Sequence, residues 1–128
     1  MKDTLHAWHH FVASQDTDLL KSILAEDCVF LSPVVHSPQH GRDITLMYLT
    51  CAMHVLQDGF RYQKEVVDGR HAVLEFVCKI DGLEINGVDI ISFDEAGQIC
   101  EFKVMLRPLK AINKVHQKMA QMLEQLST

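Results

Sequence analysis

The sequence predicts an α+β fold in which helices pack on the inner face of a curved antiparallel sheet. In the first half of the chain apolar residues recur at helical spacing, whereas from Phe60 they alternate with period two. Turn signals at Asp68-Gly69, Asp81-Gly82 and residues 94–97 divide this second part into four strands. Helical spacing returns after Pro108. This order is typical of a sheet that curls over its helices as a cone, with a pocket at the open end.

Length and composition limit the class of protein. A chain of 128 residues, 48% hydrophobic and 23% charged, is expected to form a single globular domain over residues 1–128. There is no signal-peptide core and no apolar run of about 18 residues, so we expect a cytoplasmic protein with no membrane partner. The net charge is -5 and no basic patch is interleaved with aromatic residues, which argues against nucleic-acid binding. The four cysteines are far apart and are predicted to be reduced.

The helical part begins with two short helices within residues 1–26, separated by the cap residue Asp16. Their apolar stripes are Leu5, Trp8, Phe11 and Val12, then Leu19, Leu20, Ile23 and Leu24. Residues 28–31 predict a short strand that Ser32-Pro33 stops, and a loop follows to Gly41. A third helix is expected from Asp43, which could cap it, to Asp58-Gly59. Its predicted inward residues are Ile44, Met47, Tyr48, Cys51 and Val55.

The strands after Phe60 each have one apolar face. The inward residues of two of them are Ala72, Leu74, Phe76, Cys78 and Ile80, then Cys100, Phe102, Val104 and Leu106. Proline at position 108 suits the first turn of a final helix. The apolar stripe of that helix includes Leu109, Ile112, Val115, Met119 and Met122.

Asp89 interrupts the apolar face of residues 83–93, where the odd positions read Leu, Ile, Gly, Asp, Ile and Phe. Because side chains alternate along a strand, this carboxyl is expected to point into the apolar interior. A buried carboxyl must be hydrogen-bonded, protonated or placed against a cavity. Two interpretations remain open: a structural carboxyl bonded to a donor such as Trp8 or Tyr48, or a group that faces a ligand.

Three stretches, residues 25–33, 40–44 and 88–99, resemble the nuclear transport factor 2-like superfamily, and within it the SnoaL-like and ketosteroid isomerase-like proteins. The resemblance covers nearly the whole chain and implies the cone-shaped fold. In ketosteroid isomerases a carboxylate base acts with an oxyanion hole of one tyrosine and one neutral aspartic acid. Asp89 matches the aspartic acid, but Ser32 occupies the base position and Trp8 the tyrosine position. The known isomerisation mechanism is therefore disfavoured.

The resemblance leaves function hypotheses of different classes. The first is a binding protein for a small hydrophobic molecule, without an assignable reaction. Its expected pocket residues are Trp8, Ser32, Tyr48, Phe76, Asp89, Phe102 and Leu106. The alternative is a SnoaL-like isomerase, cyclase or dehydratase in which Asp89 is the acid or polariser and His36 or His54 the base. A third is a protein-interaction module like the superfamily's transport namesake.

No cofactor or metal is expected, because the eight histidines form no pair with a carboxylate at ligand spacing. Members of the superfamily usually dimerise through the outer face of the sheet. In this chain the corresponding residues would be His71, Val73, Val77, Ile99 and Met105. The resemblance therefore predicts a homodimer through that face.

Overall fold

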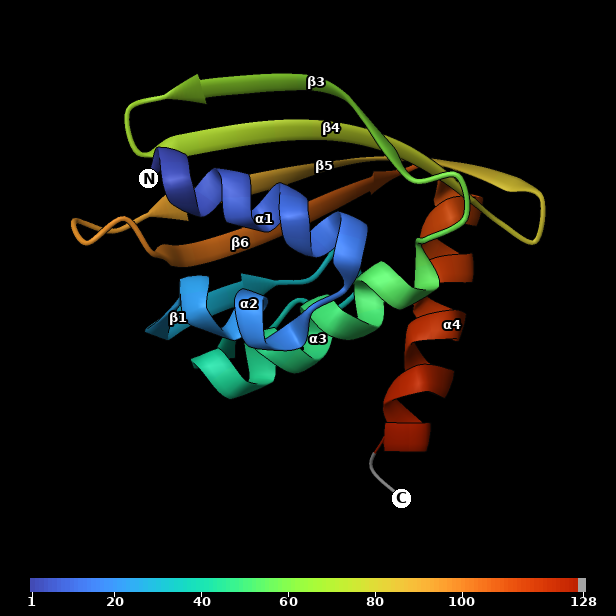
Figure 1. The fold of residues 1–128 in the computed structure, drawn as a ribbon. Coiled ribbons are helices and arrows are strands. Elements are labelled where there is room, and N and C mark those ends of the chain that lie inside the picture. The colour runs from blue at the N-terminus through green and yellow to red at the C-terminus, as the bar shows by residue number, and fades with distance from the viewer. Residues whose placement is uncertain (127–128) are drawn as a thin grey trace.

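The computed structural model describes residues 1–126, which form four helices and a six-stranded sheet (Figure 1). In chain order the elements are α1 (Lys2–Ser14), α2 (Thr17–Ile23), β1 (Leu24–Leu31), β2 (Gln39–His40), α3 (Arg42–Val55), β3 (Arg61–Asp68), β4 (His71–Ile80), β5 (Leu83–Phe93), β6 (Ile99–Arg107) and α4 (Leu109–Leu126). The predicted α+β class is confirmed, as are four consecutive antiparallel strands after Phe60.

The strands are ordered β2-β1-β6-β5-β4-β3. One pair departs from the predicted antiparallel sheet, because β1 runs parallel to β6 while the other pairs are antiparallel. A parallel pair needs a crossover connection, and here the chain between β1 and β6 contains α3 and the whole β3–β5 meander. The strand order also places β3 at one edge of the sheet, where β4 is its single neighbouring strand.

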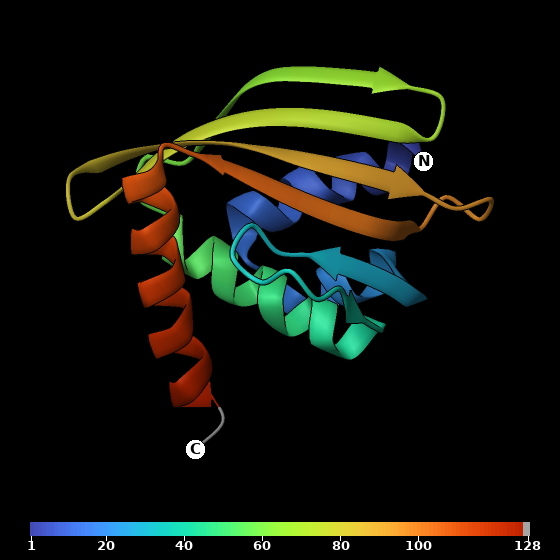
Figure 2. The same ribbon diagram turned by 180° about the vertical axis from the view of Figure 1, so that it is seen from behind.

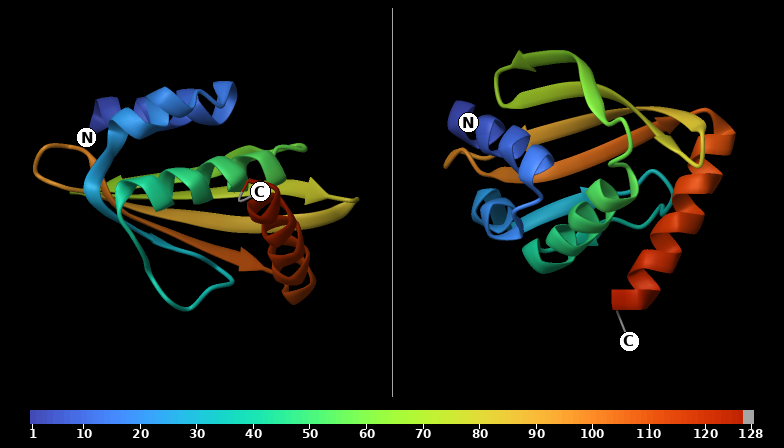
Figure 3. Two further views of the ribbon diagram at one scale, coloured as in Figure 1. Left: turned by 90° about the horizontal axis from the view of Figure 1, so that it is seen from below. Right: turned by 45° about the vertical axis from the view of Figure 1, so that its right-hand side comes forward.

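The helices cover one face of the sheet. Figure 3 shows α1, α2 and α3 in a layer above the curved strands. Figures 1 and 2 show α4 leaving the end of β6 and passing beside the C-terminal end of α3. The core therefore lies between the inner face of the sheet and three helices, and α4 closes one end. Within residues 1–126, no helix is both long enough and apolar enough to cross a membrane.

The two N-terminal helices form within the predicted range, but α2 ends at Ile23, and Leu24, which was predicted on its apolar stripe, begins β1. The Asp16 carboxylate accepts hydrogen bonds from the backbone N–H groups of Asp18 and Leu19, which caps α2. On α1, Leu5, Trp8 and Phe11 are buried against the sheet. This stripe places the Trp8 indole at the centre of the interior, where it is 1% exposed.

The inward face of α3 matches the prediction only in part: Cys51 is buried, and Tyr48 and Val55 pack partly buried against the core. The buried residues are Thr45, Leu49, Cys51 and Met53, whereas Met47 is 40% exposed. Thr45 is tolerated inside because its hydroxyl donates to the Gly41 carbonyl at 2.8 Å. Because threonine is polar, the apolar periodicity of the sequence did not indicate that position 45 lies on the buried face of the helix. Asp43 is also not the cap: it lies in the first turn, and Gly41, with φ 108°, is the capping residue.

The inner face of the sheet follows the predicted alternation. In β5 each odd residue from Ile85 to Phe93 is buried, including Asp89 at 5% exposure. Two residues predicted on the outer face are nevertheless buried, Ile99 at 0% and Val77 at 8% exposure. Ile99 is inward because the register of β5 and β6 shifts between Ser92 and Phe93, which leaves one extra residue in β6.

Candidate functional site

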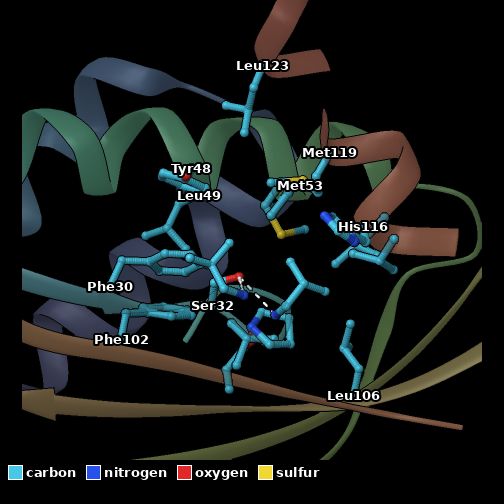
Figure 4. A pocket seen from close by; sticks show the side chains of 18 of the residues that line it. Phe30, Ser32, Tyr48, Leu49, Met53, Phe102, Leu106, His116, Met119 and Leu123 are labelled. Atoms are coloured by element: carbon cyan, nitrogen blue, oxygen red, sulfur yellow. Dashed lines mark hydrogen bonds between the residues drawn. The ribbon is translucent and has the colours of Figure 1, made fainter. Parts of the chain in front are cut away.

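A cavity of about 140 Å³ lies between the inner face of the sheet, α3, α4 and the loop after β1 (Figure 4). Its wall is almost entirely aliphatic and aromatic. All seven residues predicted for the pocket lie on the wall: Trp8, Ser32, Tyr48, Phe76, Asp89, Phe102 and Leu106. Phe30 and Tyr48 stack with ring centroids 5.3 Å apart and form one side of the pocket.

Three side chains form a hydrogen-bonded series at the polar end of the cavity. The Trp8 indole N–H donates to the Tyr62 hydroxyl at 2.9 Å. The Tyr62 hydroxyl in turn donates to Asp89 Oδ2 at 2.6 Å. The donor to Asp89 is therefore Tyr62, and neither Trp8 nor Tyr48 as the structural interpretation had suggested. The carboxyl is thus hydrogen-bonded to Tyr62 and also lines the cavity.

Burial changes the acid strength of this carboxyl. Removal from water raises the pKa of Asp89 from its ordinary value of 3.8 to about 7, and the hydrogen bond from Tyr62 opposes part of that rise. The pKa of Tyr62 is well above its ordinary value of 10, because of its burial first and then the nearby Asp89. Near neutral pH the Asp89 carboxyl is thus present in both protonation states, while Tyr62 remains a hydrogen-bond donor.

The second oxygen of Asp89 is available to a ligand. Among residues 1–126, Tyr62 is the only side chain that hydrogen-bonds to this carboxyl. When protonated, the carboxyl accepts from Tyr62 at Oδ2 and can donate from Oδ1 to a ligand oxygen. When ionised, Oδ1 can instead accept a hydrogen bond from a ligand hydroxyl. The two protonation states of the carboxyl can therefore hydrogen-bond to a carbonyl or to a hydroxyl group, respectively.

Tyr62 is held in place by rings on three sides. Phe60 packs edge-on against it at 5.0 Å between centroids, and His9 packs edge-on at 5.3 Å. Phe76 contacts it at 6.2 Å. His9 is also 2.5 Å from the Glu65 carboxylate, which joins α1 to β3 beside the tyrosine. Tyr62 is consequently held by a ring of α1, by a ring just before its own strand and by a ring of the neighbouring strand β4.

Ser32 does not have the partner that a base would need. Its hydroxyl oxygen accepts from the backbone N–H groups of Val34 and Val35, at 3.1 and 3.3 Å. Such a pattern shapes the turn at the end of β1. Within residues 1–126 no carboxylate or imidazole hydrogen-bonds to this hydroxyl. Its observed role is to position the loop that borders the pocket.

The predicted histidine bases lie outside the cavity. His36 is exposed, one residue beyond Val35, and is not on the wall. His54 is exposed on α3 and borders a separate surface depression with Asp58 and Lys79. The histidine that does line the cavity is His116, on α4. Among the described residues no three histidines, cysteines or acidic residues are grouped so that they could hold a metal ion.

Two residues of the site were missed from the sequence, Tyr62 and His116. Tyr62 lies on a strand whose other residues are all exposed, so no apolar face drew attention to it. The spacing of two between Phe60 and Tyr62 was the available signal. His116 follows Val115 and precedes Met119, both on the predicted apolar stripe of the final helix, and its place beside that stripe was the available signal.

Comparison with known proteins gives a consistent picture. The sequence profile of the SnoaL-like domain matches residues 5–102. The crystal structure of a steroid delta-isomerase from Pseudomonas aeruginosa is 34% identical, has a TM-score of 0.94, and the match covers 99% of this chain and 94% of that chain. An uncharacterised bacterial protein with a cystatin-like fold from Silicibacter pomeroyi is 32% identical, with a TM-score of 0.90 and coverage of 97% and 87%. A nuclear transport factor 2-like protein from Burkholderia xenovorans shares the fold at 19% identity, with a TM-score of 0.67 and coverage of 82% and 80%. No curated protein sequence matches the chain.

Proposed function

The chain belongs to the SnoaL-like family of nuclear transport factor 2-like proteins, and from this premise we propose that it binds an apolar small molecule with an oxygen group that lies against Asp89. The observation that carries the proposal is a cavity with aliphatic and aromatic walls and a single carboxyl in its wall. Apolar pockets with a few placed polar groups are the usual form of small-molecule sites. Ligand burial would supply affinity, and Asp89 would fix the orientation.

The volume of the cavity limits the ligand. At about 140 Å³ it is close to the cavity of about 150 Å³ that is known to bind benzene. A ligand body of one ring therefore fits the walls as they stand. The similar Pseudomonas aeruginosa protein is described as a steroid delta-isomerase. A four-ring steroid is larger than this cavity, so part of it would extend beyond the walls.

Binding of a one-ring probe tests the proposal. We expect calorimetry to show that 4-propylphenol binds the wild type, and that Asp89→Leu weakens it about tenfold through loss of one hydrogen bond to a polar end. Asp68→Leu, on the exposed edge strand, is the matched control and should bind as the wild type does. A wild type that binds no member of an alkylphenol series would contradict the proposal. Unchanged binding in a folded Asp89→Leu variant would make the carboxyl structural.

A second candidate function is an isomerase, cyclase or dehydratase, favoured by the raised pKa of Asp89. A group that titrates near the working pH is well suited to general acid catalysis, and the pKa of this carboxyl is about 7. Asp89 would polarise a substrate carbonyl. A histidine base would have to be His116, because His36 and His54 do not line the cavity.

Conversion of 3-cyclohexenone to its conjugated isomer tests this second candidate, since the product absorbs in the ultraviolet. An isomerase should form the product faster than buffer does and lose that rate in Asp89→Asn, which keeps an acceptor for Tyr62 but not the acid. His54→Gln is the matched control for His116→Gln. No rate above buffer with this ketone, together with tight 4-propylphenol binding, would favour a binding protein.

A further inference from the structure

The α4 side of the cavity contains one polar residue, His116. The other α4 residues on the wall are Val115, Met119, Ala120 and Leu123. Figure 4 shows His116 on the side of the pocket opposite Phe30 and Phe102, near Met53 and Met119. The imidazole therefore borders the same cavity as Asp89, but from a different layer of the fold.

Asp89 and His116 differ in their exposure to solvent. Asp89 is 5% exposed and lies on the central strand β5, so it belongs to the closed end. His116 is exposed, as is its neighbour Ala120, so this part of the wall opens to solvent. A ligand that has one end at Asp89 and fills the cavity would therefore extend from the closed end towards His116.

His116 makes no polar contact that would occupy it. In residues 1–126 it takes part in no hydrogen bond and no ion pair. The nearby lysines of α4 are engaged elsewhere, because Lys114 and Lys118 both pair with Asp81 at 3.4 Å. An imidazole can donate a hydrogen bond from a ring nitrogen whether it is neutral or charged. A donor at the mouth of an apolar pocket is suited to an oxygen on the ligand.

The charge of the surrounding segment favours an anion. From Lys103 to the C-terminus the sequence has five basic residues and one acidic residue, and three of the basic residues remain after Lys114 and Lys118 are paired with Asp81. A carboxylate held at an open mouth also keeps part of its hydration, which avoids the cost of full burial. Hydrogen bonds to a charged acceptor are the stronger kind.

We infer that the ligand is an apolar molecule with an oxygen group at each end, a carbonyl or hydroxyl at Asp89 and a carboxylate at His116. This inference rests on the proposed binding function and adds the chemical class of the ligand. His116 is then the residue that selects acids over the corresponding neutral molecules.

Two matched series of probes test the inference. The first series is 4-hydroxyphenyl carboxylic acids with one, two or three methylene groups between ring and carboxylate. The second is the alkylphenols in which a methyl group replaces each carboxylate. Calorimetry gives the dissociation constant of every probe for the wild type, His116→Gln, His116→Leu and the exposed control His54→Gln.

In the wild type we expect at least one acid to bind more tightly than its alkylphenol. His116→Leu should weaken that acid about tenfold and leave the alkylphenol unchanged, since one charge-assisted hydrogen bond is lost. His116→Gln should retain part of the preference, and His54→Gln all of it. Alkylphenols that bind the wild type at least as well as every acid would overturn the inference and leave the proposed function intact. So would an equal loss for acid and alkylphenol in His116→Leu. If no probe of either series binds the wild type, the proposed function itself fails.

Discussion

The Tyr62 hydroxyl donates a 2.6 Å hydrogen bond to Asp89, and this bond joins the edge strand β3 to the central strand β5 across β4. The bond provides the buried carboxyl with a donor at Oδ2 and leaves Oδ1 of Asp89 unbonded by it. The Trp8 indole donates to the same hydroxyl at 2.9 Å, so the helix layer also contributes to the arrangement. The polar end of the pocket thus depends on three elements that are far apart in the sequence.

The pH dependence of stability should reveal the buried carboxyl. The folded-state pKa of Asp89, about 7, lies above the unfolded value, so its contribution to stability is full below about pH 4 and is lost as the pH rises to about 7. The rise in the pKa of Asp89 on folding corresponds to a change of roughly 4 kcal/mol at most in the free energy of unfolding. Relative to Asp89→Asn, the wild type should lose stability across that range in urea unfolding and change no further above it. If stability depended on pH in the same way in the wild type and in Asp89→Asn, the raised pKa of Asp89 would be contradicted. The exposed control Asp68→Asn should show the same pH dependence as the wild type.

Tyr62→Phe should raise the pKa of Asp89 above about 7, because the hydrogen bond from Tyr62 now lowers it. The variant also leaves the Trp8 indole N–H without its acceptor, which costs about 1–3 kcal/mol of stability. Carbon-13 NMR of the aspartate carboxyls would follow the titration. Tyr48→Phe is the control, since Tyr48 lines the pocket without bonding to Asp89, and it should leave the pKa in place. An unchanged or lower pKa of Asp89 in Tyr62→Phe would contradict the effect assigned to this hydrogen bond.

Gly87→Ala should disturb the pocket through its wall. A Cβ at this position would lie 2.4 Å from the Phe76 ring and 2.7 Å from the Leu106 side chain, and both residues line the cavity. Overpacking of this kind costs about 1–3 kcal/mol, and probe affinity should fall with it. The double variant with Phe76→Leu should recover part of both losses, because the ring edge is removed. If the losses of stability and affinity in the two single variants simply added in the double variant, the contact between position 87 and the Phe76 ring would not be their cause.

Self-association through the outer sheet face remains a prediction, and Met105 is the residue with which to test it. The exposed apolar residues there are Val66, Val73 and Met105, at 61%, 38% and 51% exposure. They line one shallow depression. If two copies meet on this face, Met105→Glu should reduce the sedimentation coefficient to that of a monomer by burying like charges. Met47→Glu, on α3 at 40% exposure, is the control and should sediment as the wild type does. A wild type that sediments as a monomer would end the dimer hypothesis.

The strands and Asp89 were predictable because alternation with period two is a simple physical signal. It placed Asp89 inward without any knowledge of its neighbours, and the structure has it 5% exposed. The same signal failed at Ile99, since an irregular register near Ser92 reversed the alternation. The α3 stripe failed for a different reason: an inward Thr45 appears polar in the sequence but bonds to its own helix.

The partner of Asp89 was not predictable in the same way. Its donor lies 27 residues away along the chain, on a strand that exposes every residue except Tyr62. The register of β3 against β4 also shifts between Tyr62 and Lys64, so pairing could not be counted along the strand. His116 was overlooked because helical periodicity marks which residues are apolar, whereas the use of a polar residue beside the stripe depends on tertiary packing.

The position of β3 at the edge of the sheet has a consequence for acid strength. Edge strands with exposed residues open more readily than core strands, and here such an opening would withdraw Tyr62 from the carboxyl. Fraying of β3 and proton affinity at Asp89 are therefore thermodynamically coupled. Protonation of Asp89 weakens the hydrogen bond that it accepts from Tyr62. After correction for the intrinsic exchange rate, amide exchange in β3 should therefore become faster as the pH is lowered through the titration of Asp89. A partner that adds a strand to this free edge would, by the same coupling, make the carboxyl more acidic.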